Sequence, residues 1–100
     1  MTTPTIIAPV HPGEILADDL DELQISQSQL ARALGVPRSR INQIVLGHRS
    51  IEADTALRLA RFFGTSDRYW LNLQARYHLE VTKDALGDAL AKVQPLNTAS

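Results

Sequence analysis

Residues 26–47, SQSQLARALGVPRSRINQIVLG, predict two short helices joined by a tight turn. Ser26 and Gln29 have the spacing of a capping box, so the first helix is expected to begin directly after the serine. Gly35 tolerates a positive φ and ends that helix, and Pro37 suits the start of the next one. This pattern is typical of a helix-turn-helix, a unit whose second helix enters the major groove of DNA.

The second helix, expected over residues 37–46, is rich in side chains that suit contacts with DNA bases. Arginine matches guanine in the geometry of its donors, and asparagine and glutamine match adenine. Between Gln27 and Arg49 the chain has four arginines and no acidic residue. Simple exposure to solvent is the alternative for each residue alone, but it explains the whole cluster less well. We therefore expect base contacts from Arg38, Ser39, Arg40, Asn42 and Gln43.

The net charge of −1 on its own argues against a nucleic-acid partner. The charges are separated along the chain, however, because acidic side chains gather in residues 14–22, ahead of the arginines. Two surfaces of opposite charge indicate two kinds of partner. Solubility alone is the simpler explanation for any one carboxylate, and acid–base chemistry or metal binding lacks convergent side chains. The acidic residues are Glu14, Asp18, Asp19, Asp21 and Glu22.

Length and composition exclude several classes of protein. With 100 residues, of which 44% are hydrophobic, the chain has enough material for one modest core. No apolar run reaches the roughly 18 residues of a transmembrane helix, and MTTPTIIAPV at the start lacks the pattern of a signal peptide. Without cysteine we expect neither disulfides nor thiolate metal sites. The sequence therefore predicts one cytoplasmic domain without a cofactor or a metal.

An enzyme is the least favoured class. Catalysis needs a convergent nucleophile, base or metal site, and the chain has no cysteine, no paired histidines and no glycine-rich phosphate loop. His11, His48 and His78 are far apart and lack the spacing of metal ligands. We expect all three to be non-catalytic, and we expect His48, which follows the second helix, to contact phosphate.

The segment before the helix-turn-helix divides in two. Residues 1–10, which contain two prolines, predict a flexible arm. A helix then begins at Pro12, a residue favoured in the first helical position, and Glu14 suits the positive end of its dipole. The apolar stripe of this helix consists of Ile15, Leu16, Leu20 and Leu23.

Two further helices follow the helix-turn-helix. The stretch IEADTALRLARFFG, residues 51–64, predicts a helix that is buried on most sides, with Arg58 and Arg61 pointing outward. Ser66 is expected to cap the next helix, and Trp70 to close the core. A core this small has no room for every aromatic and leucine side chain of that helix, so the surplus predicts a dimer interface. Its residues are Tyr69, Leu73, Tyr77 and Leu79.

The motif QLARALGVPRSRINQIVLGHRSI, residues 29–51, resembles the Cro/C1-type (XRE) helix-turn-helix. HPGEIL at residues 11–16, DTALRLARFFG at 54–64 and YWLNLQARYHL at 69–79 together resemble the HigA (VapI-like) family of antitoxins. This combination covers most of the chain and is far more specific than the helix-turn-helix alone.

The resemblance implies an all-α, five-helix, lambda-repressor-like (XRE) domain over residues 11–81, with a C-terminal dimerisation helix. Residues 82–100 would then be a C-terminal extension, partly helical or frayed. Antitoxins of this family form homodimers, bind inverted-repeat operators in double-stranded DNA, repress their own operon and neutralise a HigB-type toxin, an mRNA endonuclease of the RelE class. A stand-alone XRE-family transcriptional repressor without a toxin partner is the alternative.

Roles for single residues also follow from the resemblance. Residues 37–46 correspond to the recognition helix, and Gln27 matches a position that contacts phosphate. Arg49 is expected to be a second phosphate contact. Pro37 departs from the serine or threonine cap that is usual at the start of this helix. Because HigB-type toxins are basic, the acidic first helix is expected to bind the toxin, through Asp18, Asp19, Asp21 and Glu22.

Overall fold

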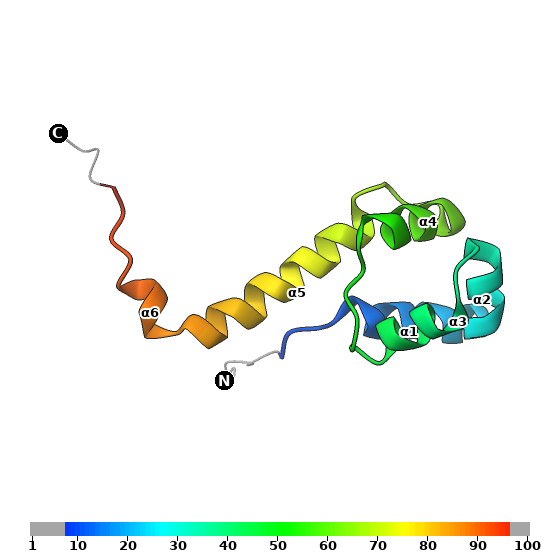
Figure 1. Ribbon diagram of the computed structural model, residues 1–100, viewed down its shortest axis with the longest axis horizontal. Helices are drawn as coiled ribbons and strands as arrows, with labels where there is room; N and C mark the ends of the chain where they lie inside the picture. Colours follow the sequence, from blue (N-terminus) through cyan, green and yellow to red (C-terminus); the bar gives the residue numbers. More distant parts are fainter. Residues whose placement is uncertain (1–7, 97–100) are drawn as a thin grey trace, which may run out of the picture.

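The computed structural model describes residues 8–96. Within that range the chain forms the helices α1 (Pro12–Leu23), α2 (Gln27–Leu34), α3 (Arg38–Val45), α4 (Ala53–Phe63), α5 (Tyr69–Leu86) and α6 (Asp88–Ala91). Figure 1 shows α1 to α4 packed together, while the second half of α5 extends away from them and carries α6 at its end. The all-α class is as predicted, and the short α6 adds to the five expected helices.

The helix-turn-helix forms as its local signals predict. The Ser26 hydroxyl accepts a hydrogen bond from the Gln29 N–H at 3.0 Å, and the Gln29 side-chain oxygen accepts one from the Ser26 N–H at 2.8 Å. Gly35 ends α2 with a φ of 73°. Pro37 lies one position before α3 and provides no side-chain hydrogen bond, so α3 begins at Arg38 without a side-chain cap.

A second capping box at the start of α1 was not predicted, because histidine is not among the usual capping residues. The His11 Nδ1 accepts a hydrogen bond from the Gly13 N–H at 2.8 Å, and the Glu14 carboxylate accepts one from the His11 N–H at 3.3 Å. Pro12 occupies the first helical turn, as expected. This box fixes the direction in which α1 enters the core.

The core lies between the first four helices and the start of α5. Trp70 is fully buried there, as predicted, and its ring lies against that of Phe63 with centroids 5.8 Å apart. Leu23, expected in the apolar stripe of α1, is instead 54% exposed because α1 passes the edge of the core at that point. The buried cluster consists of Leu16, Leu20, Leu30, Ala31, Leu34, Ile41, Ile44, Ile51, Ala56, Leu59 and Trp70.

Helix α4 is buried on one face only, and the prediction that it is buried on most sides was wrong. Ala56, Leu59 and Ala60 face the core, whereas Leu57 is 51% exposed. The reason is that α4 packs mainly against α2 and α5, so the rest of its surface faces solvent. Arg58 is exposed, as predicted, but its guanidinium also donates a hydrogen bond to the carbonyl oxygen of Leu34 at 2.7 Å.

Helix α5 begins later than predicted. Ser66 does not cap it; the Ser66 carbonyl accepts the N–H of Tyr69 across a turn, and Arg68 is the residue before the helix. The helix then continues without a break to Leu86, through the boundary predicted after residue 81.

The two ends of the chain are described only in part. Residues 8–10 of the predicted arm are not helical, and neither are residues 92–96 of the predicted extension. The remainder of the arm, residues 1–7, and the last residues, 97–100, lie outside the described residues. No helix in the described range has the length and apolarity to cross a membrane.

Candidate nucleic-acid interface

Helix α3 has one buried face and one exposed polar face. Ile41 and Ile44 are fully buried, and the 3.6-residue period places the predicted contacts Arg38, Ser39 and Gln43 away from them. All three are exposed. Leu46, directly after the helix, lies on this side as well and is 57% exposed. Sequence reasoning counted Leu46 as part of the helix but gave it no role, although an exposed apolar side chain suits contact with a thymine methyl group.

A hydrogen bond between two of the predicted contacts joins the start of α2 to the middle of α3. The Asn42 side-chain amide donates a hydrogen bond to the side-chain oxygen of Gln27 at 3.1 Å. Gln27 is the first residue of α2, beside the backbone N–H groups that attract anions at a helix N-terminus. Both side chains are half-buried, so each combines a fixed position with access to solvent.

The predicted phosphate contacts His48 and Arg49 are exposed in the turn that follows α3. This turn is held to α5, because the Ile51 N–H donates to the side-chain oxygen of Gln74 at 2.7 Å. Gln74 is buried, and its amide lies 3.0 Å from the ring Nε2 of His78. Nothing in the local sequence distinguishes Gln74 as an anchor, since its role depends on a contact 23 residues away.

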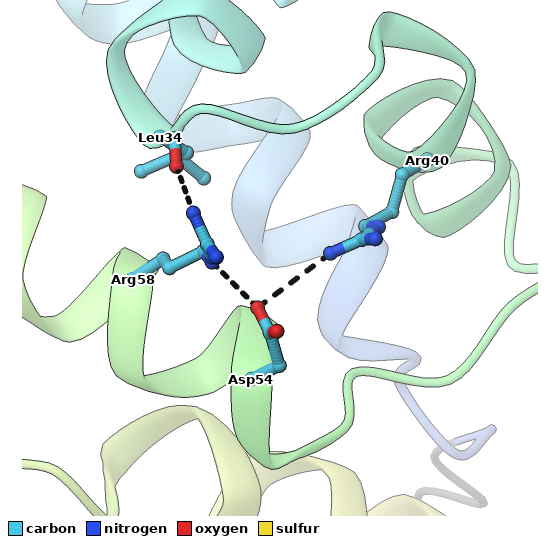
Figure 2. Close-up of polar contacts among 4 residues, drawn as sticks. All are labelled: Leu34, Arg40, Asp54 and Arg58. Atoms are coloured by element: carbon cyan, nitrogen blue, oxygen red, sulfur yellow. Dashed lines mark hydrogen bonds and ion pairs between the residues drawn. The ribbon is translucent and has the colours of Figure 1, made fainter.

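Arg40 occupies a different position from the other polar residues of α3. Its side chain is only 25% exposed and points toward the first turn of α4, where its guanidinium lies 3.6 Å from the carboxylate of Asp54 (Figure 2). The sequence of α3 alone places Arg40 with the exposed residues, because the contact with α4 depends on the packing of the two helices. In this position the guanidinium lies against α4, and its contact with DNA bases stays a prediction.

Helix α1 supports α3 by direct backbone contact. A Cβ atom placed on Gly13 would lie 1.8 Å from the carbonyl oxygen of Ile44, far inside van der Waals distance. Only glycine therefore allows α1 to approach the end of α3 this closely. The sequence contains HPGEIL as a motif, but the need for glycine at its third position becomes visible only in the packed structure.

The thermal stability of the protein at different pH values tests the role of the His11 imidazole as a helix cap. Burial lowers the pKa of the His11 imidazole, although nearby Glu14 acts in the opposite direction. The unfolded chain therefore binds the proton more readily, so stability is complete above the ordinary pKa of about 6.5 and decreases as pH falls from there to the folded-state pKa. We expect the thermal midpoint to fall between about pH 7.5 and 5, and to fall less for His11→Asn, which keeps a capping side chain. An equal decrease of the thermal midpoint in the wild type and in His11→Asn would show that the His11 imidazole does not cause the pH dependence.

The predicted acidic surface of α1 separates into two parts. Asp18, Asp19 and Glu22 lie together, and Asp19 and Glu22 line a hollow of about 230 Å³ beside Tyr69. Asp21, three residues after Asp18, lines a different hollow that also includes Gln27. Burial, followed by the charges of Glu22 and Asp18, raises the pKa of the Asp19 carboxyl. Among the described residues there is no group of three or more side chains suited to hold a metal ion.

The four residues predicted for dimerisation do not form one exposed stripe. Tyr69 and Leu79 are exposed, the latter by 61%. Leu73 packs against the core of its own chain, and the ring of Tyr77 meets the His11 ring edge-on at 4.9 Å. Leu73 and Tyr77 are therefore only partly available to a second copy.

Comparison with known proteins assigns this arrangement to a family. The helix-turn-helix family model matches residues 16–70, which include the capping box of α2 and the whole of α3. An addiction module antidote protein of the HigA family from Coxiella burnetii superposes with a TM-score of 0.86 and is 47% identical, over 89% of this chain and 99% of that one. The chain belongs to the helix-turn-helix family, in its HigA group.

Two further relatives agree with this assignment. The Pseudomonas aeruginosa antitoxin HigA, solved with the higBA promoter, superposes with a TM-score of 0.83 and is 47% identical, over 88% of this chain and 98% of that one. Virulence-associated protein I of Dichelobacter nodosus is 49% identical over 75 residues, which cover 74% of this chain and 69% of the relative. The family comprises DNA-binding regulators and antitoxins, not enzymes, in agreement with the prediction from sequence.

Proposed function

We propose that the chain is a DNA-binding antitoxin that represses its own operon and neutralises a HigB-type toxin of the RelE class. The observation that carries the DNA-binding part is the exposed polar face of α3, fixed by the two isoleucines buried behind it. The promoter complex of the Pseudomonas aeruginosa relative supports this assignment. The protein acts in the cytoplasm, where operator and toxin are both present.

A homodimer follows from the size of this surface. One α3 contacts too few base pairs to select a single site in a genome, whereas two copies related by a two-fold axis place their recognition helices in successive major grooves about 34–36 Å apart. The operator is then an inverted repeat with half-sites about one helical turn apart. We place the dimer interface on α5, through Tyr69 and Leu79 and the exposed edges of Leu73 and Tyr77.

Substitutions on α3 test the DNA-binding part. Arg38→Ala or Gln43→Ala should weaken operator binding by about 1–3 kcal/mol and reduce the preference for operator over random DNA, because each removes a base contact. Gln27→Ala should weaken binding to both DNAs alike, since it removes a phosphate contact. Affinities are measured by fluorescence anisotropy with labelled operator and random duplexes of equal length.

A matched control for Arg38→Ala is Arg61→Ala, which removes the same charge from an exposed position on α4. This variant should bind both DNAs nearly as the wild type does. If Arg38→Ala lowers operator and random-DNA affinity equally, α3 does not read bases through this residue.

We place the toxin on the acidic surface formed by Asp18, Asp19 and Glu22. The elevated pKa of Asp19 means that its charged form is disfavoured there, so a cationic side chain of a basic partner would stabilise it. Asp21, which the sequence included in this surface, lies on the side of Gln27 and takes no part in the proposed contact.

Reversing two charges tests this toxin surface. Asp18→Lys with Asp19→Lys should abolish co-purification with the product of the adjacent small reading frame, and with it protection from that product's toxicity, while operator binding is retained. The matched control is Asp84→Lys with Asp88→Lys, two exposed positions at the far end of the molecule. Full toxin binding by the Asp18/Asp19 variant would place the toxin elsewhere. No toxicity and no complex with the wild type would leave a stand-alone repressor.

A further inference from the structure

Asp54 lies between two arginines that come from different helices. Its Oδ1 is 2.5 Å from the Nε of Arg58, one turn later in α4, and 3.6 Å from the Nη1 of Arg40 on α3 (Figure 2). Charge-assisted hydrogen bonds are usually about 2.7–2.9 Å long, so the contact with Arg40 is an ion pair without a good hydrogen bond. Asp54 therefore interacts more strongly with Arg58 than with Arg40.

Arg58 would keep Asp54 in place without Arg40. Its Nη1 donates to the carbonyl oxygen of Leu34, at the end of α2, at 2.7 Å. One nitrogen of Arg58 thus donates to Asp54, and another donates to the helix-turn-helix backbone. Figure 2 shows Arg58 between Asp54 and the Leu34 carbonyl. The carboxylate stays satisfied and oriented when Arg40 is elsewhere.

Arg40, by contrast, is incompletely satisfied in its present position. Its Nε is buried and has no hydrogen-bond partner among the described residues. An arginine side chain carries five N–H donors, and buried polar groups are normally hydrogen-bonded, so a donor left without an acceptor destabilises this position. A DNA phosphate or the edge of a guanine offers two acceptors in the geometry of the guanidinium fork.

We propose that Asp54 competes with DNA for Arg40 and so determines operator affinity. In the free protein Arg40 rests against Asp54, and on the operator it moves to the DNA, leaving Asp54 with Arg58. The contact between Arg40 and Asp54 must then break before the operator complex forms, and the free energy of that contact weakens operator binding. This inference rests on the proposed DNA binding through α3, and it adds a residue of α4 that opposes that binding.

Two simpler effects of Asp54 would give different results. A carboxylate near DNA repels phosphates whether or not Arg40 is present, and its loss also releases Arg58. If Asp54 instead braced α3 through Arg40, its loss would weaken binding. A double-mutant cycle between the two residues separates these cases, because only competition for Arg40 makes the effect of Asp54 depend on Arg40.

The experiment measures operator and random-DNA affinity for the wild type, Asp54→Asn, Arg40→Ala and the double variant. Thermal unfolding of each variant sets a temperature at which all four are folded. We expect Asp54→Asn to tighten operator binding by about threefold or more, Arg40→Ala to weaken it, and Asp54→Asn to have a clearly smaller effect in the Arg40→Ala protein. Weaker binding by Asp54→Asn, or equal gains in both backgrounds, would overturn the inference.

A measurement on the wild type gives the same answer without any change in stability. The side-chain Nε–H resonance of Arg40, assigned by its loss in Arg40→Ala, should shift when operator is added, whereas that of Arg58 should stay in place. An Arg40 resonance that does not move would overturn the inference. If the wild type fails to prefer operator over random DNA, the proposed function itself is wrong, and this result is distinguishable from an unchanged Arg40.

Discussion

Gly13→Ala should destabilise the protein by at least about 2 kcal/mol. The added methyl group would lie 1.8 Å from the carbonyl oxygen of Ile44, a backbone atom that cannot rotate away. The start of α1 and the end of α3 must therefore move apart, and this cost exceeds the gain of roughly 1 kcal/mol from replacing a helical glycine by alanine. Chemical denaturation followed by circular dichroism measures the change.

The same variant should also lose DNA affinity, because α3 is the element displaced. Asp18→Ala provides the control, since it adds an alanine at an exposed position of the same helix and should change stability by no more than about 0.5 kcal/mol. A denaturation midpoint of Gly13→Ala equal to that of the wild type would show that α1 and α3 are not in the close contact described.

Trp70→Ala has the largest expected effect on stability. Trp70 is fully buried and contacts the rings of Phe63 and Tyr69. Removing a buried aromatic side chain costs about 3–5 kcal/mol, against a total stability of about 5–15 kcal/mol for a domain of this size. We expect the variant to be largely unfolded at physiological temperature, with loss of helical circular dichroism.

Trp70→Phe separates the loss of volume from the loss of the indole N–H. The Nε1 of Trp70 is buried without a hydrogen-bond partner in the described part of the chain, so phenylalanine gives up no hydrogen bond. It should therefore be much less destabilising than alanine. Equal destabilisation by both substitutions would mean that the indole group makes a specific contact at this position.

The elements that depend on neighbouring residues could be predicted from the sequence. The start of α2 follows from Ser26 and Gln29, and its end from Gly35, because capping and a positive φ are local properties. Those signals also placed α3 within one residue of its observed start. The exposed face of α3 followed in turn from the helical period.

The features that depend on contacts between helices could not be predicted. Arg58 looked like an outward residue of an amphipathic helix, yet the carbonyl of Leu34 at the end of α2 lies within its reach. Arg40 belongs by sequence to the polar part of α3, but its guanidinium forms an ion pair with Asp54 of α4. In each case the partner lies 14 or more residues away, at a distance set only by packing.

A footprint on the DNA upstream of the chain's own operon is the most direct test of DNA recognition through α3. We expect two protected half-sites, related by inversion and centred about one helical turn apart, which disappear when Arg38 is replaced by alanine but persist in the Arg61→Ala control. Absence of protection with the wild type, or a footprint unchanged by Arg38→Ala, would contradict DNA recognition through the exposed face of α3.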